Sequence, residues 1–160
     1  MPNLMPRSMT MEDIPLVVEW MVSIPLWQRY QVSAPAAHTR FEQGLQQGDI
    51  LLVSDWGGEN RAVGFTWCLP EGAFGLSAYI RLIGVRPDHA GHGIGAALLA
   101  ETEQLAGEFA KDMFLLVSDF NVDAQRFYQR HGYTQVGAIP GYVLPDVTEL
   151  VFRKRLLDAS

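Results

Sequence analysis

The sequence predicts a mixed α/β fold, on two observations. Some segments have apolar residues at every second position, as in a strand, and others have them at the spacing of a helix. The two kinds of segment alternate along the chain. One such succession forms a β-α-β unit, with a strand over residues 76–85, a helix ending near residue 110 and an apolar strand over 113–117. Such a crossover makes its two strands parallel and is almost always right-handed.

Length and composition place the chain among globular proteins. Its 160 residues suit one domain over 1–160, and 48% apolar with 19% charged residues argues against disorder. No apolar run reaches the roughly 18 residues that a membrane span needs. The start of the chain lacks the apolar stretch of a secretory signal, and Cys68 is its single cysteine. We therefore expect a cytoplasmic protein with neither a disulfide nor a metal site.

The charge balance argues against one class of partner. With 12 basic and 18 acidic residues the net charge is −6, whereas binding to a nucleic acid backbone rests on clustered Lys and Arg. The one basic cluster, Arg153-Lys154-Arg155, is expected at a solvated strand or helix end. We therefore expect no nucleic acid and no membrane as a partner.

Two helices and a hairpin are expected in the first half of the chain. Thr10 or Asp13 precedes an apolar-periodic run with Pro15 in its first turn, which is how a helix begins. Gly57 and Gly58 supply the positive φ angles of a tight hairpin turn. The elements expected here are a helix over residues 14–21, a loop over 24–30, a helix over about 36–47 closed by Gly48, strands over 50–54 and 61–69, and a loop over 70–75.

The second half is expected to alternate strands and helices. One face of the strand over 76–85 is apolar and is expected in the core, with Leu76, Ala78, Ile80 and Leu82. The other face begins with Ser77, Tyr79 and Arg81 and is expected to line a cleft. The elements that follow are the helix ending near residue 110, a strand over 113–117 covered on both faces, a helix from about 121 to 130, and strands over 133–138 and 148–155.

A glycine-rich turn carries the strongest chemical signal. The strand ending at Val85 is followed by three alternate glycines, Gly91, Gly93 and Gly95, that open a helix. Glycine lets successive backbone N–H groups converge without Cβ collisions, and the helix start adds N–H donors and a partial positive charge. Together these features predict a cradle for a phosphate or a diphosphate.

Two nucleotide-binding motifs fit this turn less well. As letters, Gly91-x-Gly93-x-x-Ala96 satisfies the dinucleotide fingerprint, but that fingerprint needs an acidic ribose ligand after the second strand. Lys111 stands near the expected distance, and Asp112 precedes the strand. A P-loop would close with Lys-Ser or Lys-Thr, which this turn lacks.

Two motifs together resemble the acetyl-CoA site of the GCN5-related N-acetyltransferase (GNAT) superfamily. The first is Val85-x-Pro87, then Gly91-x-Gly93-Ile-Gly95-x-x-Leu98, and the second is Asn121-x-x-Ala124-x-x-Phe127-Tyr128-x-x-x-Gly132-Tyr133. Both stand in the family's order and spacing, and the likeness covers the whole chain. It implies a mixed, mostly antiparallel twisted sheet with a central, splayed parallel β-α-β unit and helices on both faces.

The resemblance also implies a reaction and a site. The reaction is transfer of an acetyl group from acetyl-CoA to a primary amine of a small molecule or an exposed protein amine, by direct attack in a ternary complex. Backbone groups of residues 83–85 would bind the pantetheine arm, and the glycine turn would bind the diphosphate. The residues implied for the cofactor are Ile83, Gly84, Val85, Gly91, His92, Gly93, Ile94, Gly95, Ala96, Asn121 and Phe127.

Tyr128 is implied as the general acid, with its hydroxyl facing the sulfur of the cofactor. On reference values, a phenol of pKa about 10 suits a leaving thiolate whose thiol has a pKa of about 8.5 or above. The backbone N–H near Val85 is expected to stabilise the oxyanion that develops. For the base that deprotonates the amine, Tyr79, Glu71 and ordered water stay open, while Arg81 is better suited to bind an acidic group of the acceptor.

One position departs from the family pattern, and the acceptor side is open. Ala90 stands where the family has Gln or Arg, so phosphate binding would rest more on backbone N–H groups, with His92 as an added contact. His89 and His92 are otherwise expected to be simply exposed.

The candidate acceptor residues are Trp27, Tyr30, Tyr79, Arg81 and Tyr142. For Trp27, Tyr30 and Tyr142 the alternative is that the ring only anchors the surrounding structure.

Two other functions are compatible with the same residues. A catalytically silent CoA-binding module with a regulatory or interaction role is supported by Ala90, whereas Tyr128 and Asn121 speak against it. A dinucleotide-dependent oxidoreductase would require NAD in place of CoA. The expected partners are a small-molecule or peptide amine acceptor and, through the exposed late strands, a homodimer.

Overall fold

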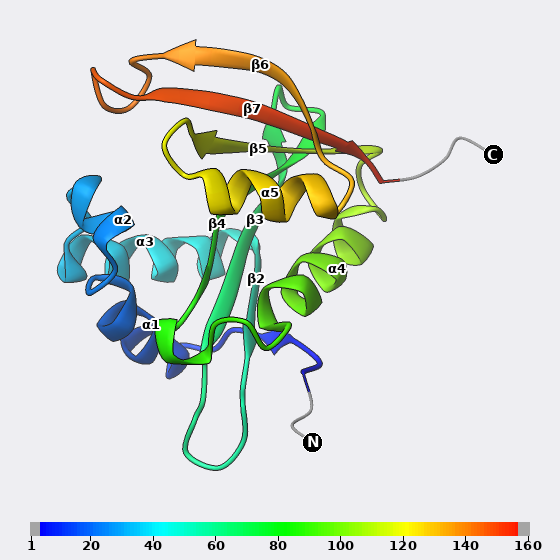
Figure 1. Cartoon of the computed structure of the whole chain (residues 1–160). Coiled ribbons are helices and arrows are strands. Elements are labelled where there is room, and N and C mark those ends of the chain that lie inside the picture. Colours follow the sequence, from blue (N-terminus) through cyan, green and yellow to red (C-terminus); the bar gives the residue numbers. More distant parts are fainter. Residues whose placement is uncertain (1–3, 157–160) are drawn as a thin grey trace. The chain divides into compact units, whose positions relative to one another are not determined.

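The computed structural model describes residues 4–156 of the chain. Figure 1 shows its helices and strands with their labels. They are β1 (Arg7–Ser8), α1 (Asp13–Met21), α2 (Pro25–Arg29), α3 (Ala34–Gln47), β2 (Ile50–Ser54), β3 (Gly64–Ala73), β4 (Ser77–Val85), the short 3₁₀ turn η1 (Pro87–His89), α4 (Ile94–Ala106), β5 (Asp112–Ser118), α5 (Val122–Arg130), β6 (Thr134–Pro140) and β7 (Thr148–Arg155).

A mixed sheet forms the framework. Within the described residues its seven strands follow the order β1-β2-β3-β4-β5-β7-β6. β4 and β5 are parallel, from the pair Ala78–Met113 to the pair Ile80–Leu115, and α4 lies between them in the chain. The pairs β1–β2, β2–β3, β5–β7 and β6–β7 are antiparallel. The predicted α/β fold with one parallel β-α-β unit is therefore confirmed.

The chain divides into two compact units. Unit 1 comprises Met1–Cys68 and Leu82–Thr102, and unit 2 comprises Leu69–Arg81 and Glu103–Ser160. The elements β3, β4 and α4 each pass from one unit into the other. The expectation of a single domain over 1–160 stays a prediction.

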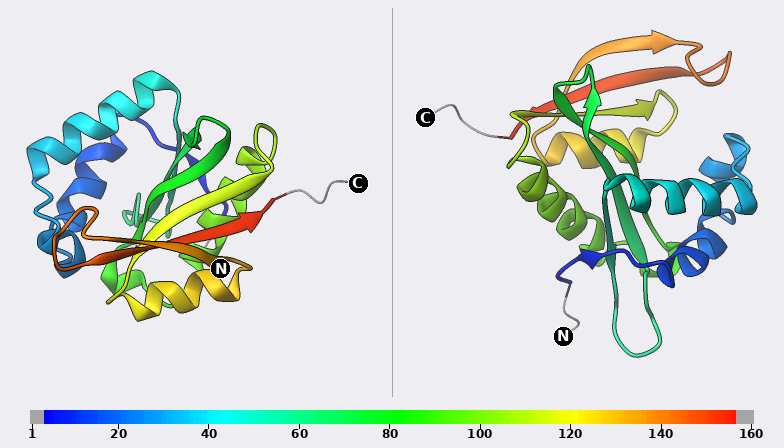
Figure 2. Two further views of the ribbon diagram at one scale, coloured as in Figure 1. Left: turned by 90° about the horizontal axis from the view of Figure 1, so that it is seen from above. Right: turned by 180° about the vertical axis from the view of Figure 1, so that it is seen from behind.

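Helices cover both faces of the strands in unit 1. A Cβ at Gly44 of α3 would lie 2.7 Å from the Trp67 ring of β3. A Cβ at Gly64, which has the opposite parity on β3, would lie 2.7 Å from Ile94 of α4. Because odd and even residues of a strand point to opposite faces, α3 and α4 pack on opposite sides of β3, and Figure 2 shows α3 lying across these strands.

Aromatic rings fill the face beneath α3. Phe41 contacts Phe65 edge-on at 5.4 Å between ring centroids and stacks on Trp67 at 5.0 Å. Trp20 of α1 is buried, and its Nε1 donates to the carbonyl of Ala62 at 3.0 Å. Large rings of this kind contribute much of the hydrophobic stabilisation of a core.

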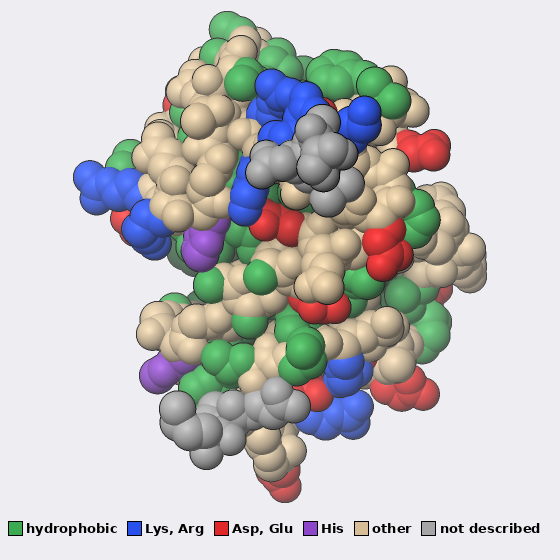
Figure 3. Space-filling view, turned by 90° about the vertical axis from the view of Figure 1, so that its right-hand side faces the viewer, with side chains coloured by type: hydrophobic (Ala, Val, Ile, Leu, Met, Phe, Trp, Pro, Cys, Tyr) green, Lys and Arg blue, Asp and Glu red, His purple; other side chains and the backbone are tan. Residues whose placement is uncertain are grey.

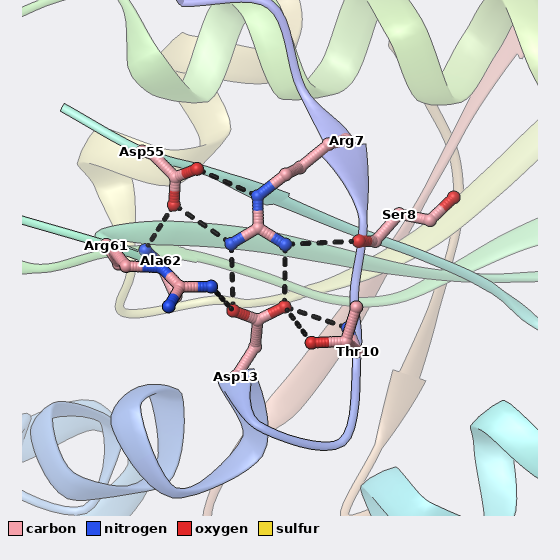
Figure 4. A network of polar contacts seen from close by, with 7 residues as sticks. All are labelled: Arg7, Ser8, Thr10, Asp13, Asp55, Arg61 and Ala62. Carbon is pink, nitrogen blue, oxygen red and sulfur yellow. Dashed lines mark hydrogen bonds and ion pairs between the residues drawn. The ribbon is translucent and has the colours of Figure 1, made fainter. Parts of the chain in front are cut away.

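An ion-pair network ties the start of the chain to α1 and to the β2–β3 turn (Figure 4). Arg7 donates two hydrogen bonds of 2.8 Å to the fully buried carboxylate of Asp13 and one of 2.8 Å to Asp55. Burial alone would raise the pKa of Asp13, but hydrogen bonds from Arg7 and Thr10 outweigh it and lower that pKa. Hydrogen bonds from Arg7, then from the N–H of Ala62, likewise lower the pKa of Asp55.

In unit 2 the helix α5 packs on the strands β5 and β7. The side chains of Met113, Leu115 and Val117 on β5 are buried, and the Tyr128 ring of α5 lies 6.3 Å from the Phe152 ring of β7. Phe114 and Leu116, which have the opposite parity, are half-buried. The strand expected to be covered on both faces is therefore covered fully on one face and partly on the other.

Ion pairs engage all three residues of the basic cluster near the C-terminus. Arg153 and Arg155 both reach the carboxylate of Asp112, at 2.8 and 3.1 Å, and Lys154 reaches Glu103 at 2.8 Å. These contacts join β7 to the start of β5 and to α4 within unit 2. The basic cluster therefore serves to hold elements of unit 2 together. Figure 3 shows basic and acidic side chains on the same face of the molecule.

Three local expectations are corrected. Residues 25–29 form the short helix α2, because Pro25 occupies the first helical position, where a missing N–H costs nothing. β3 continues through Pro70 to Ala73. Pro70 is tolerated there because the pairing of β3 with β2 ends at Cys68, so its missing N–H breaks no hydrogen bond to β2. Leu76 precedes β4 and is 77% exposed, so it lies outside the core.

α4 ends at Ala106 rather than near residue 110, where the sequence predicted its end. Cys68 is buried. Among residues 4–156, the longest helices are too short or too polar to cross a membrane.

Candidate functional site

The turn between β4 and α4 adopts the backbone conformation that its glycines predict. Gly91 and Gly93 have φ angles of 80° and 81°, in the left-handed region that side chains rarely adopt. A Cβ at Gly91 would meet no atom within 4 Å, and one at Gly93 would meet only Leu4, at 3.8 Å. Close packing therefore does not explain these glycines, whereas the backbone conformation of an anion cradle does.

The first turn of α4 continues the cradle. Ala97 donates its N–H to the carbonyl of Gly93 at 3.1 Å, and this bond begins the helical ladder. The N–H groups of Ile94, Gly95 and Ala96 precede it and project from the helix start. They add the partial positive charge of a 13-residue helix to the glycine turn. This combination fits a phosphate or a diphosphate.

Side chains of unit 1 hold the start of this turn. The N–H of Arg86 donates to the carbonyl of Val63 at 2.7 Å. Its guanidinium donates to Asp88 at 2.7 Å and to Asn60 in the β2–β3 turn at 3.1 Å. Hydrogen bonds from Arg86, and then from His89, lower the pKa of Asp88 to about 2. The residues just before the glycines are therefore fixed to the hairpin.

Two histidines flank the position where the family pattern has Gln or Arg. The rings of His89 and His92 contact the Trp56 ring, with centroid separations of 5.5 and 4.9 Å. His92 is exposed within the glycine turn, and Ala90 exposes only a methyl group. Of the side chains in this stretch, His92 is thus the one with hydrogen-bonding nitrogens that stands inside the glycine run.

Ile83, Gly84 and Val85 form the end of β4. The backbone N–H of Arg86 points to the start of β3, where it donates to Val63. Successive residues of a strand direct their N–H and C=O groups to opposite edges, so the backbone groups of Gly84 also point to β3. Val85, and by the same alternation Ile83, direct their backbone groups to the other edge. A strand edge of this kind can pair with an extended, amide-containing ligand.

In unit 2, Asn121 stands at the start of α5 and Phe127 lies on this helix. Asn121 caps this helix, since its side-chain oxygen accepts from the N–H of Ala124 at 3.2 Å. Phe127 is half-buried, and its ring contacts His131 at 4.6 Å and Tyr128 at 5.3 Å. Asn121 is therefore the N-cap of α5, and part of its hydrogen-bonding capacity serves the helix.

Tyr128 lies deeper in unit 2 than its exposed neighbours on α5. The residue is 6% exposed, and its ring contacts Tyr133 at 5.7 Å. Burial raises the pKa of Tyr128 strongly, and the nearby Tyr79 raises it further. The hydroxyl is therefore a neutral hydrogen-bond donor over the whole physiological pH range, with a pKa well above the reference value of a phenol.

The predicted acceptor residues fall in both units. In unit 2, burial raises the pKa of Tyr79, and the charges of Tyr142, Arg81 and Glu149 act on it. Tyr142 is 62% exposed. In unit 1, Trp27 is buried beside Trp20, with 6.4 Å between ring centroids, and Tyr30 is half-buried at the end of α2. Their roles toward an acceptor stay predictions.

Glu149 was not among the sequence-based candidates. It lies on β7, is 6% exposed and is paired in register with Ser118 of β5. Its charge raises the pKa of Tyr79. The sequence carries a weak signal for it, because Glu149 stands directly before the apolar run Leu150-Val151-Phe152, and a carboxylate buried beside such residues is unusual unless it has polar neighbours.

The fold and the glycine turn together define an α/β protein whose strand-to-helix turn has a backbone suited to a phosphate-bearing ligand, and the comparisons identify its family. Residues 16–133 match the model of the acetyltransferase (GNAT) family. This match covers more than half of the chain, and the chain belongs to that family. The resemblance predicted from the two motifs is confirmed.

Solved structures share the fold over nearly the whole chain. Ribosomal-protein-alanine N-acetyltransferase from Brucella melitensis has a TM-score of 0.77 at 20% identity, covering 94% of this chain and 99% of its own. Aminoglycoside 6'-N-acetyltransferase complexed with coenzyme A has 0.79 at 12%, covering 98% and 99%. The protein yncA from Salmonella typhimurium, solved with its cofactor acetyl-CoA, has 0.76 at 17%, covering 99% and 96%. At these identities the likeness establishes the fold.

Proposed function

We propose that the protein is an acetyl-CoA-dependent N-acetyltransferase that acts on a primary amine of a small molecule or on an exposed protein amine. The observation that carries this proposal is the pair of left-handed glycines, Gly91 and Gly93, that opens α4 in a chain of the GNAT family. The presence of coenzyme A or acetyl-CoA in two of the similar structures supports the choice of ligand.

The chain's own groups suit each part of this cofactor. The N–H groups from Gly91 to Ala96 donate to the diphosphate, with His92 beside them. Backbone groups of Ile83 and Val85 pair with the amides of the pantetheine arm, while the half-buried ring of Phe127 and the amide of Asn121 contact it. Bound acetyl-CoA supplies an activated acetyl group as a thioester.

Tyr128 acts by hydrogen bonding to the sulfur. Its raised pKa keeps the hydroxyl protonated, so the donor is in place whenever the cofactor arrives. A free thiol has a pKa of about 8.5, so full transfer of the proton from a phenol of higher pKa to a thiolate is uphill. Tyr128 therefore stabilises the charge on the sulfur as a donor and keeps most of its proton in that bond.

The amine enters as a neutral nucleophile after it loses a proton. Tyr79 is poorly suited as that base, because burial raises its pKa and the residue stays protonated near neutral pH. Water and Glu71, which is exposed on β3, are the remaining routes for the proton. Arg81, Tyr142 and Tyr30 are the proposed contacts of the acceptor.

An acetyl-CoA turnover assay over a panel of amines tests the proposal. Thiol release with at least one amine is expected. Tyr128→Phe should lower kcat by about 100-fold, the size of the loss when one hydrogen-bond donor to a developing charge is removed, while the Kd for acetyl-CoA stays within about twofold, because the hydroxyl acts on the sulfur during the reaction.

Tyr133→Phe is the matched control. It removes a hydroxyl that donates to Glu103 at 2.7 Å in the same unit, and kcat should be unchanged. CoA binding with no thiol release for any amine, and no effect of Tyr128→Phe, would instead establish the catalytically silent module.

A further inference from the structure

One contact in unit 1 links the short helix α2 to the end of β4. The indole of Trp27 lies on the backbone of Gly84, so that a Cβ built at Gly84 would overlap Cη2 of that ring. The same Cβ would lie 3.3 Å from Cζ2 of Trp27 and 3.1 Å from Cε1 of Phe65. Gly84 is not in the left-handed region of φ, so the ring, and not the backbone conformation, demands glycine here.

The ring is itself held in place. Trp27 is 6% exposed and contacts Phe65 and Trp20 at 5.9 and 6.4 Å between ring centroids. Such tilted aromatic contacts are favourable beyond the area they bury. Two further contacts hold its neighbours in place: Trp20 donates from Nε1 to the carbonyl of Ala62, and Phe41 packs edge-on against Phe65. The Trp27 ring therefore packs rigidly against the end of β4.

The opposite side of this strand region is packed as well. A Cβ at Gly64, the β3 neighbour of Gly84, would lie 2.7 Å from Ile94 and 2.9 Å from Leu98 of α4. It would also lie 3.4 Å from the carbonyl oxygen of Gly84. The end of β4 thus lies between the Trp27 ring on one face and the start of α4, with its cradle, on the other.

We propose that Trp27 is a positioning residue for the thioester arm of the cofactor, acting through Gly84. Resting on the proposed function, this assigns to the indole the task of fixing the neighbouring backbone groups of Ile83 and Val85, which pair with the arm. It gives the predicted acceptor residue Trp27 a role toward the cofactor instead. It also makes the size match between positions 27 and 84 a determinant of acetyl-CoA affinity.

The test is a pair of complementary substitutions. Gly84→Ala places a Cβ against the indole and displaces the strand end. The Kd for acetyl-CoA should rise about tenfold, which corresponds to one or two lost backbone hydrogen bonds. Trp27→Phe lacks the two ring carbons that meet this Cβ. In the double variant Trp27→Phe/Gly84→Ala, the Kd should return to within about threefold of the wild type.

A second ligand separates positioning from a general loss of structure. The molecule 3′-phosphoadenosine 5′-diphosphate carries the diphosphate but no pantetheine arm, and its Kd should be unchanged in Gly84→Ala. Equal weakening of both ligands, or no weakening of either, would overturn the proposal. If the double variant does not fold, this difference between the ligands in Gly84→Ala decides alone.

Gly44→Ala is the matched control for overpacking. Its Cβ would lie 2.7 Å from the Trp67 ring, so it strains the same aromatic core from α3. It should lower the midpoint of thermal unfolding, while the Kd for acetyl-CoA is unchanged.

Two outcomes keep this proposal separate from the proposed function. A wild-type protein that binds neither acetyl-CoA nor 3′-phosphoadenosine 5′-diphosphate contradicts the proposed function itself. A wild type that binds both, with a double variant that binds acetyl-CoA no better than Gly84→Ala, contradicts only the role of Trp27.

Discussion

At the scale of single residues, the backbone demands of the site are readable from the sequence and its electrostatics are not. Alternate glycines such as Gly91 and Gly93 indicate backbone in the left-handed region, because few other residues adopt that φ angle. The raised pKa of Tyr128 is different. It depends on burial by Tyr133 and Phe152, which the sequence places on later segments with no local sign of the contact.

Gly93→Val should weaken acetyl-CoA binding by about 100-fold. A branched side chain at a φ of 81° strains the turn and occupies the space before the N–H groups. The loss of one or two hydrogen bonds to a charged diphosphate accounts for about 3 kcal/mol, and hence for this factor. Isothermal titration with acetyl-CoA measures it.

Gly48→Val is the control for that measurement. Gly48 ends α3 with a φ of 79°, and a Cβ there would meet no atom within 4 Å. The Gly48→Val variant therefore has the same backbone strain as Gly93→Val, at a position outside the proposed site. A Gly93→Val protein that binds acetyl-CoA as tightly as the Gly48→Val protein would show that the glycine turn does not hold the cofactor.

At the scale of elements, long periodic segments are predictable and short ones are not. α3 follows its sequence signals, with Ser33 as the cap and Gly48 after the last turn. α2 and β1 have five and two residues, too few to show a period. Their places are set by contacts with distant parts of unit 1, and the clearest is the bond of Arg7 to Asp13 and Asp55 (Figure 4).

Asp13→Asn should destabilise unit 1 in a pH-dependent way. The folded state lowers the pKa of Asp13, so the ion pair stabilises the fold above the unfolded pKa of about 3.9. That stability is lost as the pH falls through the lower, folded value. We expect a loss of about 3 kcal/mol at pH 7, as for a broken buried pair, and a shrinking difference from the wild type below about pH 5.

Urea unfolding followed by tryptophan fluorescence measures this, because Trp20, Trp27, Trp56 and Trp67 all belong to unit 1. Glu108→Gln, which removes an exposed carboxylate, is the control and should unfold like the wild type. If the difference between Asp13→Asn and the wild type is the same at pH 7 and pH 3.5, the ion pair is not the source of the stability.

At the scale of the whole molecule, the order of elements gives the topology. The glycine turn between two apolar strands predicts the parallel pair β4–β5, because only a crossover connection can join them in that way. The acceptor side is less accessible to such reasoning. Trp27 looks like a residue of an exposed loop in the sequence, yet it is buried against Gly84 by rings that lie far from it in the chain.

The central claim concerns where the cofactor's diphosphate is held. A crystal structure of the protein with coenzyme A tests it most directly. The account predicts that the diphosphate oxygens accept hydrogen bonds from backbone N–H groups between Gly91 and Ala96. A coenzyme whose diphosphate lies elsewhere, with that turn in contact only with protein atoms, would contradict it.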